Sequence, residues 1–282
     1  TISTSKRTNY NLLSAKNMNK IIKSNKPDII INCLGVVGGI QWGIANKLKI
    51  TLENNTLTMN LLNAIKSKKT HLINIIANCI YPFKYNNYSE NLIFDGAVHP
   101  SVFAYGMSRR LLLSSSITLS QNSEVSNTNI ILANVYGPGD HFDEYRSHAL
   151  GGLIKKFYNA KINKEAFVEI WGTGKPKRDW IYIDDVSKAI LSIIKLSNSK
   201  LPQNINIASS NCISIKYLAN KIRKLIKYKG KINFNTNYQD GDPIKKFSTH
   251  IAKSKLKWKP KISIEEGLQK TINYYIRLKN EK

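Results

Sequence analysis

Three short runs rich in β-branched and other apolar residues, at 28–34, 71–77 and 128–134, constrain the fold of this chain most strongly. They do not alternate polar with apolar positions, and such runs are typical of strands buried on both faces of a parallel sheet. Segments with helical spacing, 57–65 and 103–119, lie between them. Parallel strands need crossovers of that kind. The pattern therefore predicts an α/β fold with a doubly wound, mainly parallel sheet, in which the three runs form central strands.

The second half of the chain repeats this alternation with shorter strands. Residues 168–171 and 180–183 have strand patterns, and a Gly-Thr-Gly-Lys-Pro turn segment separates them. Apolar residues at 186–194 follow helical spacing, and Ser263 with Glu266 forms a capping box at the start of a last amphipathic helix. This half therefore predicts a smaller C-terminal α/β domain.

The beginning of the chain lacks one feature of a doubly wound nucleotide-binding domain. Such a domain opens with a strand, a glycine-rich turn and a helix whose N-terminus binds phosphate. Nothing before Asp28 fits that pattern. Residues 1–7 instead suit the end of a second strand, and a helix is expected around 15–24. We therefore expect the sheet to lack its first βα unit.

The charge of the chain restricts its partners. It has 43 Lys and Arg against 18 Asp and Glu, a formal net charge of +25 and a pI near 9.9. Only 7 of the cations are Arg, and the lysines are scattered. Proteins that bind nucleic acids cluster their cations and interleave them with aromatic residues. The pattern favours a solvated lysine surface, and next a basic site for a small anion, over a nucleic-acid partner.

Other sequence features bear on the compartment. No run of 18 apolar residues exists, and residues 1–11 are too polar for a signal peptide. Cys33, Cys79 and Cys212 are an odd number of cysteines without CxxC spacing. They predict reduced thiols rather than disulfides or a metal site. We expect a cytoplasmic protein that binds no metal and does not enter a membrane.

Several segments at the ends of predicted strands and helices resemble those of a known family. They are 37–40 (VGGI), 78–82 (NCIYP), 105–109 (YGMSR), 134–138 (NVYGP), 147–148 (SH), and 171–174 (WGTG) with Arg178. On these residues the chain resembles the extended short-chain dehydrogenase/reductase family, or NAD-dependent epimerase/dehydratase family, and within it the GDP-L-fucose synthases. The resemblance covers essentially the whole chain.

The resemblance implies a fold, a reaction and partners. The fold would be Rossmann-like, and the cofactor NADP(H). The reaction would epimerise C3 and C5 of a GDP-linked 4-keto-6-deoxy sugar and then reduce C4. The protein would be a homodimer formed through the helices that contain Leu57 and Tyr105. The expected division is a truncated dinucleotide-binding domain of 1–147 and 179–208, and a substrate-binding domain of 148–178 and 209–282.

The resemblance also assigns catalytic residues. Cys79 and His148 would be the acid/base pair, since both residue types can titrate near neutral pH in suitable surroundings. Tyr105 would donate a proton to the C4 oxygen, and a cation one helical turn later would stabilise its phenolate. That cation is Arg109 where the family has Lys, and Ala77 stands where the family has Ser. Because of these two departures we expect the reduction of C4 to be slow.

The remaining expected site residues bind substrate or cofactor. For the substrate they are the diphosphate-binding cations Lys156, Arg178 and Lys245, the pocket wall Trp171, and Asn134 on the sugar. For the cofactor they are Arg7 at the 2′-phosphate, Gly35, where the backbone approaches closely, Tyr105, Arg109 and Asn134.

Two alternatives stay open at this point. The chain could act on another nucleotide-linked sugar, such as a heptose, because the pocket around 142–146 is not readable from sequence. It could also be a catalytically impaired relative that serves as a binding subunit, which Ala77, Arg109 and the absent glycine-rich turn favour.

Overall fold

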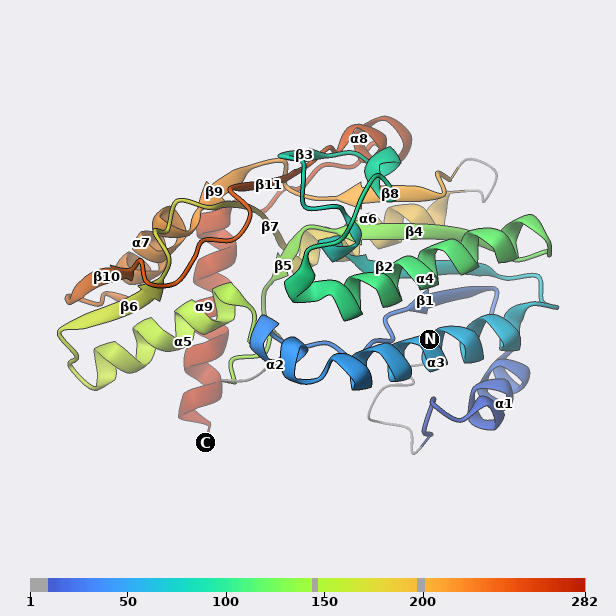
Figure 1. Cartoon of the computed structure of the whole chain (residues 1–282), viewed down its shortest axis with the longest axis horizontal. Helices are drawn as coiled ribbons and strands as arrows, with labels where there is room; N and C mark the ends of the chain where they lie inside the picture. Colours follow the sequence, from blue (N-terminus) through green and yellow to red (C-terminus); the bar gives the residue numbers. More distant parts are fainter. Residues whose placement is uncertain (1–9, 144–146, 197–200, 282) are drawn as a thin grey trace.

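The computed structural model describes residues 10–143, 147–196 and 201–281 (Figure 1). Its helices are α1 (Ala15–Asn25), α2 (Ile40–Ala45), α3 (Lys47–Ile65), α4 (Phe103–Gln121), α5 (Ala149–Ile162), α6 (Ile183–Lys195), α7 (Ile215–Ile226), α8 (His250–Leu256) and α9 (Ile264–Asn280). Its strands are β1 (Ile29–Asn32), β2 (His71–Ala77), β3 (Asn87–Tyr88), β4 (Ser126–Leu132), β5 (Asn134–Tyr136), β6 (Phe167–Trp171), β7 (Lys177–Tyr182), β8 (Asn204–Ile207), β9 (Cys212–Ser214), β10 (Lys231–Asn235) and β11 (Ile244–Phe247).

The main sheet is parallel, with strand order β1-β2-β4-β8. Helices α3 and α4 cover one face, and α6 lies on the other (Figure 1). Isoleucines of β2, β4 and β8, namely Ile73, Ile130 and Ile205, are fully buried in the core between these layers. The α/β fold with a parallel sheet is as the sequence predicts.

A row of asparagine side chains fixes the register of all four strands. Asn32, Asn74, Asn129 and Asn204 are Cα partners across the sheet. Each amide Nδ2 donates to the next Oδ1, from Asn32 to Asn74 to Asn129 at 2.9 Å each and from there to Asn204 at 3.0 Å. A slip of one residue would leave these buried amides unpaired. The row therefore specifies the pairing.

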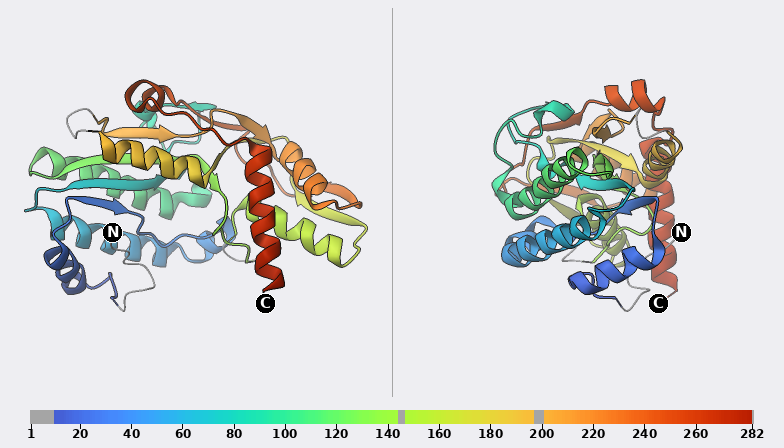
Figure 2. Two further views of the ribbon diagram at one scale, coloured as in Figure 1. Left: turned by 180° about the vertical axis from the view of Figure 1, so that it is seen from behind. Right: turned by 90° about the vertical axis from the view of Figure 1, so that its right-hand side faces the viewer.

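The prediction that 28–34 forms a central strand buried on both faces is wrong. The strand is β1, and it pairs only with β2 among the described strands, so it lies at the edge. Ile30 packs toward α1 and α3, whereas Ile29 and Ile31 point to the other face and are 38% and 43% exposed. Figure 2 shows α6 crossing the other strands on that face while no drawn helix covers β1.

Two other expected strands have different bounds. The run at 128–134 divides into β4 and the short β5, and Asn134 begins the second of these. Ile183, expected to end a strand, instead begins α6. The helices expected around 15–24 and 103–119 are α1 and α4. The expected strand end at 1–7 lies outside the described residues.

Two smaller sheets are built mostly from the second half of the chain, with β3 and β5 added from the first half. In one, β6 pairs with β10; in the other the order is β3-β11-β7-β5, with β9 antiparallel to β7. Their core contains Leu150, Phe157, Trp180 and Leu218. Within the described ranges no helix is both long and apolar enough to span a bilayer.

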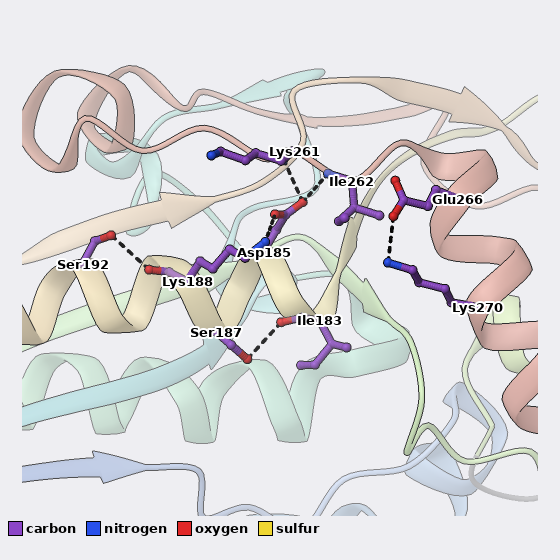
Figure 3. Close-up of polar contacts among 9 residues, drawn as sticks. All are labelled: Ile183, Asp185, Ser187, Lys188, Ser192, Lys261, Ile262, Glu266 and Lys270. Carbon is purple, nitrogen blue, oxygen red and sulfur yellow. Dashed lines mark hydrogen bonds and ion pairs between the residues drawn. The ribbon is translucent and has the colours of Figure 1, made fainter.

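Asp185, in the first turn of α6, ties the last segment of the chain to this framework. Its Oδ2 accepts hydrogen bonds from the backbone N–H groups of Lys261 and Ile262 at 2.9 and 2.8 Å (Figure 3). Its Oδ1 lies 3.9 Å from Lys188 Nζ. Ser263 then caps α9 by accepting from the Glu266 N–H, as the capping box predicts. One buried carboxylate thus positions the segment that leads into α9.

We expect Asp185→Ala to lower the free energy of unfolding by about 1.5–3 kcal/mol, because two partly buried N–H groups lose a charged acceptor. Urea unfolding followed by circular dichroism measures this. Asp184→Ala is the matched control, since the exposed Asp184 shares the first turn of α6 and its helix-dipole interaction. Equal losses in the two variants would contradict the role of the Lys261 and Ile262 contacts.

Candidate functional site

The candidate site begins where β2 ends. Cys79 lies in the short 3-10 helix Asn78–Ile80 directly after β2, and Tyr105 lies in the first turn of α4. Gly106 allows these elements to touch, because a Cβ there would be 2.8 Å from the carbonyl oxygen of Cys79. The backbone contact places the thiol near the phenol, and Cys79 raises the pKa of Tyr105.

Arg109, one turn after Tyr105, is only 2% exposed and is bound to the protein itself. Its Nη1 donates to the Leu34 carbonyl oxygen at 2.9 Å, and its Nη2 donates to Asn54 Oδ1 at 2.8 Å. The Asn54 side chain also pairs with the backbone N–H and C=O of Val36. The guanidinium therefore joins α4, α3 and the loop after β1.

Burial dominates the electrostatics of the two candidate catalytic groups. It raises the pKa of Tyr105 to about 12, with the nearby Cys79 adding to the rise and Arg109 opposing it. It raises the pKa of the Cys79 thiol to about 11, against the opposing charges of Lys245 and Arg109. Arg109 does favour the phenolate, as expected, but the desolvation is larger. Both groups are therefore protonated at neutral pH without a ligand.

Lys245 and Arg178 bring positive charge to the same place from the second half of the chain. They are Cα partners between β11 and β7. Burial lowers the pKa of each, and the pKa of Lys245 is lowered further by Arg178 and raised by Cys79. Arg178 Nη1 donates to the Asp242 carbonyl oxygen at 2.6 Å. Two half-buried cations side by side form a site suited to an anion.

Lys156 and Trp171 belong to a different group of contacts. Lys156 Nζ donates to the Glu169 carbonyl oxygen at 3.2 Å and lies 5.4 Å from the ring centroid of Trp171. Trp171 stacks on Tyr238, which the sequence analysis missed because a tyrosine in a polar loop gives no periodic signal. The described contacts thus join Arg178 with Lys245, and Lys156 with Trp171.

His148 and Asn134 are engaged elsewhere in the described structure. His148 is exposed at the N-cap of α5. No contact between His148 and Cys79 is recorded within the described residues. Asn134 Nδ2 donates to the carbonyl oxygen of Asp179 at 2.9 Å. Arg7 lies outside the described residues.

Asp179 is another group that sequence reasoning missed. It is fully buried and accepts hydrogen bonds from Ser209 and Ser210 at the end of β8. Burial raises its pKa to about 6 despite these bonds. It braces the strand that carries Arg178. In the described part of the chain, no three His, Cys, Asp or Glu side chains gather as metal ligands.

The residues that the resemblance assigns to the nicotinamide ribose fit such a group. Arg109 Nε is a buried donor without a partner among the described residues, and the guanidinium carbon lies 5.4 Å from the Tyr105 ring centroid. Gly35 lies alongside, since a Cβ there would meet Arg109 Nη1 at 3.4 Å. An unpaired donor beside a phenol suits a ribose hydroxyl.

We expect Lys245→Met to slow alkylation of Cys79 by iodoacetamide about 2- to 10-fold at pH 9, because losing the ammonium raises the pKa of the thiol further. Peptide-resolved mass spectrometry measures the rate at each cysteine. Lys246→Met is the control, because Lys246 lowers the pKa of Cys212 instead. This substitution should slow the alkylation of Cys212 and leave the alkylation of Cys79 unchanged. Equal slowing of Cys79 in both variants would contradict the pairing of Lys245 with Cys79.

Comparison with known proteins places these residues in a family. The sequence profile of the NAD dependent epimerase/dehydratase family matches residues 2–208. The chain is 30% identical over 272 residues to GDP-L-colitose synthase of Yersinia pseudotuberculosis, covering 95% of this chain and 88% of that protein. It is 24% identical over 279 residues to GDP-L-fucose synthase of Escherichia coli K12, and the match covers 96% of this chain and 87% of that protein.

Solved structures agree on the fold. A GDP-6-OMe-4-keto-L-xylo-heptose reductase from C. jejuni superposes with a TM-score of 0.84 at 21% identity, covering 95% of this chain and 87% of that one. A GDP-L-fucose synthetase from Naegleria fowleri, bound to NADP, superposes with a TM-score of 0.83 at 23% identity, covering 95% of this chain and 82% of that one. With the fold, the profile and the curated relatives in agreement, the chain belongs to the NAD-dependent epimerase/dehydratase family.

Proposed function

We propose that the chain is a nucleotide-sugar epimerase/reductase of the GDP-L-fucose synthase type. It would use NADP(H) on a GDP-linked 4-keto-6-deoxy sugar. The proposal is supported by the position of Cys79, which packs against Gly106 beside Tyr105 and interacts electrostatically with both Tyr105 and Lys245, while Arg178 pairs with Lys245 across β7 and β11. A proton-transfer pair next to an anion site suits a sugar carried on a diphosphate. The names of the curated relatives, a GDP-L-colitose and a GDP-L-fucose synthase, support the substrate class.

The proposed roles follow from the chemistry of a 4-keto sugar. The ketone acidifies the protons on C3 and C5, so a base can remove each one and an acid can return it to the other face. Cys79 and His148 would share these steps. Tyr105, protonated at neutral pH, would donate to the C4 oxygen. Bound NADP(H) would supply the hydride that reduces C4, with Tyr105 and Arg109 at its ribose.

Binding of the substrate would be divided among the cations and the pocket wall. Arg178 and Lys245 would hold the diphosphate, because both are half-buried beside each other. Trp171, with the Lys156 ammonium 5.4 Å from its ring centroid, would form the wall of the pocket beside the nucleoside part. We propose the same division of the chain as before, with 1–147 and 179–208 for the cofactor and 148–178 and 209–282 for the sugar nucleotide. Because its three cysteines are free thiols, we propose that the protein is located in the cytoplasm.

Epimerisation can be tested without reduction, because enolate formation needs no hydride. In D₂O the protein should incorporate deuterium at C3 and C5 of a GDP-4-keto-6-deoxy sugar, as NMR would detect. Cys79→Ala and His148→Ala should each slow incorporation by about 10²–10⁴. The rate should rise with pH between 7 and 9, since the Cys79 thiolate forms only as pH approaches about 11.

Cys33→Ala and His250→Ala are the matched controls for that experiment, since both side chains are exposed and outside the site. They should leave the incorporation rate unchanged. A folded sample that binds the sugar nucleotide but incorporates no deuterium would support the alternative of a binding subunit. The bonds that hold Arg109 on Leu34 and Asn54 are the observation that favours this alternative.

Reduction should be slow in this chain. Ala77 lacks a hydroxyl that would bond the keto oxygen, and loss of such a donor costs about 10²–10³ in rate. Arg109 keeps the charge of a lysine but not its compact ammonium. In a chain that carries a glycine-rich phosphate-binding turn, Ala77→Ser with Arg109→Lys should raise NADPH oxidation at least about tenfold. Turnover of about 1 s⁻¹ or more without these substitutions would contradict this view.

The sugar itself is a second question. Solved relatives in the fold comparison include a GDP-mannoheptose C4 reductase from Campylobacter jejuni, bound to NADP. A GDP-linked heptose is therefore the alternative substrate that we propose. Offering 4-keto-6-deoxy and 4-keto-heptose sugar nucleotides side by side in the deuterium experiment distinguishes the two.

We also propose a homodimer formed through α3 and α4, which pack side by side on one face of the sheet (Figure 1). Both helices expose large apolar side chains: Leu48 is 71% exposed, Leu52 58% and Phe103 56%. Leu52→Lys should shift the protein to monomers in sedimentation velocity, because it places a charge in the contact. Leu191→Lys, at an equally exposed leucine on α6, should not. Unchanged sedimentation of the Leu52 variant would contradict this interface.

A further inference from the structure

An exposed pair of aromatic rings lies beside the anion site. Trp171 ends β6, and Tyr238 follows β10 in the loop that leads to β11. Their ring centroids are 4.3 Å apart and their planes differ by 12°, which is a stacked arrangement. Trp171 is 52% exposed and Tyr238 44% exposed. A flat aromatic surface is thus open to solvent at this position.

Neighbouring polar groups hold the pair in place. Trp171 Nε1 donates to Glu169 Oε1 at 3.2 Å, and Asn235 Nδ2 donates to the other oxygen of the same carboxylate at 3.1 Å. The Gly172 N–H donates to the carbonyl oxygen of Asn235 at 2.9 Å. Glu169 and Asn235 therefore fix the orientation of the indole relative to the strand from which the Tyr238 loop emerges.

The free aromatic surface belongs to Tyr238 rather than to Trp171. Tyr238 covers one face of the indole, and the Lys156 ammonium lies 5.4 Å from the ring centroid. Lys156 approaches from α5 and donates to the Glu169 carbonyl oxygen, whereas Tyr238 comes from the side of β10. Among the described ring contacts Trp171 has two partners, Tyr238 and Lys156, whereas the Tyr238 ring contacts only Trp171 and is therefore the freer of the two for another planar group.

The loop that carries Tyr238 leads directly to the cation pair. Asp240 accepts a hydrogen bond from the Thr173 N–H at 2.9 Å, and the Asp242 carbonyl oxygen accepts one from Arg178 at 2.6 Å. Lys245 follows on β11, paired with Arg178. A ligand with a planar ring at one end and a diphosphate at the other could therefore contact Tyr238 and the cations together.

We propose that Tyr238 is the stacking surface for the base of a nucleoside diphosphate, with Trp171 as its support and the phosphates at Arg178 and Lys245. This inference rests on the anion site of the proposed function and extends it to a specific residue. Base–aromatic stacking is favourable and tolerates any base, because every base has a π-face. A phenol ring held by a stacked indole loses little conformational freedom when it binds.

Isothermal titration of GDP and of inorganic pyrophosphate into the full chain tests this role. Tyr238→Ala should weaken GDP binding by about 5- to 150-fold, the range for loss of one stacked base. It should leave pyrophosphate binding unchanged, because the cations are intact. Tyr238→Phe keeps the ring and should bind GDP like the unaltered protein. Tyr217→Ala, at a tyrosine 41% exposed on α7, is the control for removal of a surface ring.

The outcomes separate the two proposals. If the unaltered protein binds GDP and Tyr238→Ala binds it equally well or more tightly, the stacking role is wrong while the anion site stands. If Tyr238→Ala weakens pyrophosphate as much as GDP, the residue supports the loop and not the base, which also overturns the role. If the unaltered protein binds neither compound, the proposed anion site itself fails and the stacking role fails with it.

Discussion

The candidate site depends on a cation that is buried without a carboxylate among its described hydrogen-bond partners. Arg109 is held by two neutral acceptors, the Leu34 carbonyl oxygen and the Asn54 amide oxygen. Burying an unpaired charge is costly, so these bonds must persist for α4 to pack as it does. Because they come from the loop after β1 and from α3, they join three elements beneath Tyr105. The same contact therefore stabilises the fold and adds positive potential at the phenol and the Cys79 thiol.

The second half of the chain adds charge of the same sign. Arg178 and Lys245 lie on paired strands, and burial lowers the pKa of both, as it does for Arg109. Asp242 partly offsets the effect of burial on Arg178 and Lys245, but within the described residues none of the three cations donates a hydrogen bond to a carboxylate, which leaves the site short of negative charge. An anionic ligand would supply it, and would stabilise the cations in their charged forms. This deficit, and not the overall charge of +25, is the physical reason to expect a diphosphate-linked substrate.

The elements were predictable from sequence because their signals are local. The isoleucine-rich runs and the spacing of Leu61 and Ile65 gave β2, β4 and α3, and short motifs brought Cys79 together with Tyr105. The edge position of β1 was not predictable, since an apolar run looks alike at the edge and at the centre of a sheet. Asn54 and Tyr238 were missed for a related reason: each acts through a contact to a residue more than 50 positions away. A polar residue on a helix or in a polar loop has no sequence periodicity that would predict such a distant contact.

We infer that the Arg178–Lys245 cation pair and the Cys79–Tyr105 pair form a single ligand site. A crystal structure with a bound GDP-linked sugar tests this most directly. We expect diphosphate oxygens at about 2.7–3.2 Å from the side-chain nitrogens of Arg178 and Lys245. We also expect the sugar ring to extend from there toward Cys79 Sγ and the Tyr105 hydroxyl. A sugar nucleotide bound away from these cations, or one whose sugar points away from Cys79 and Tyr105, would contradict this inference.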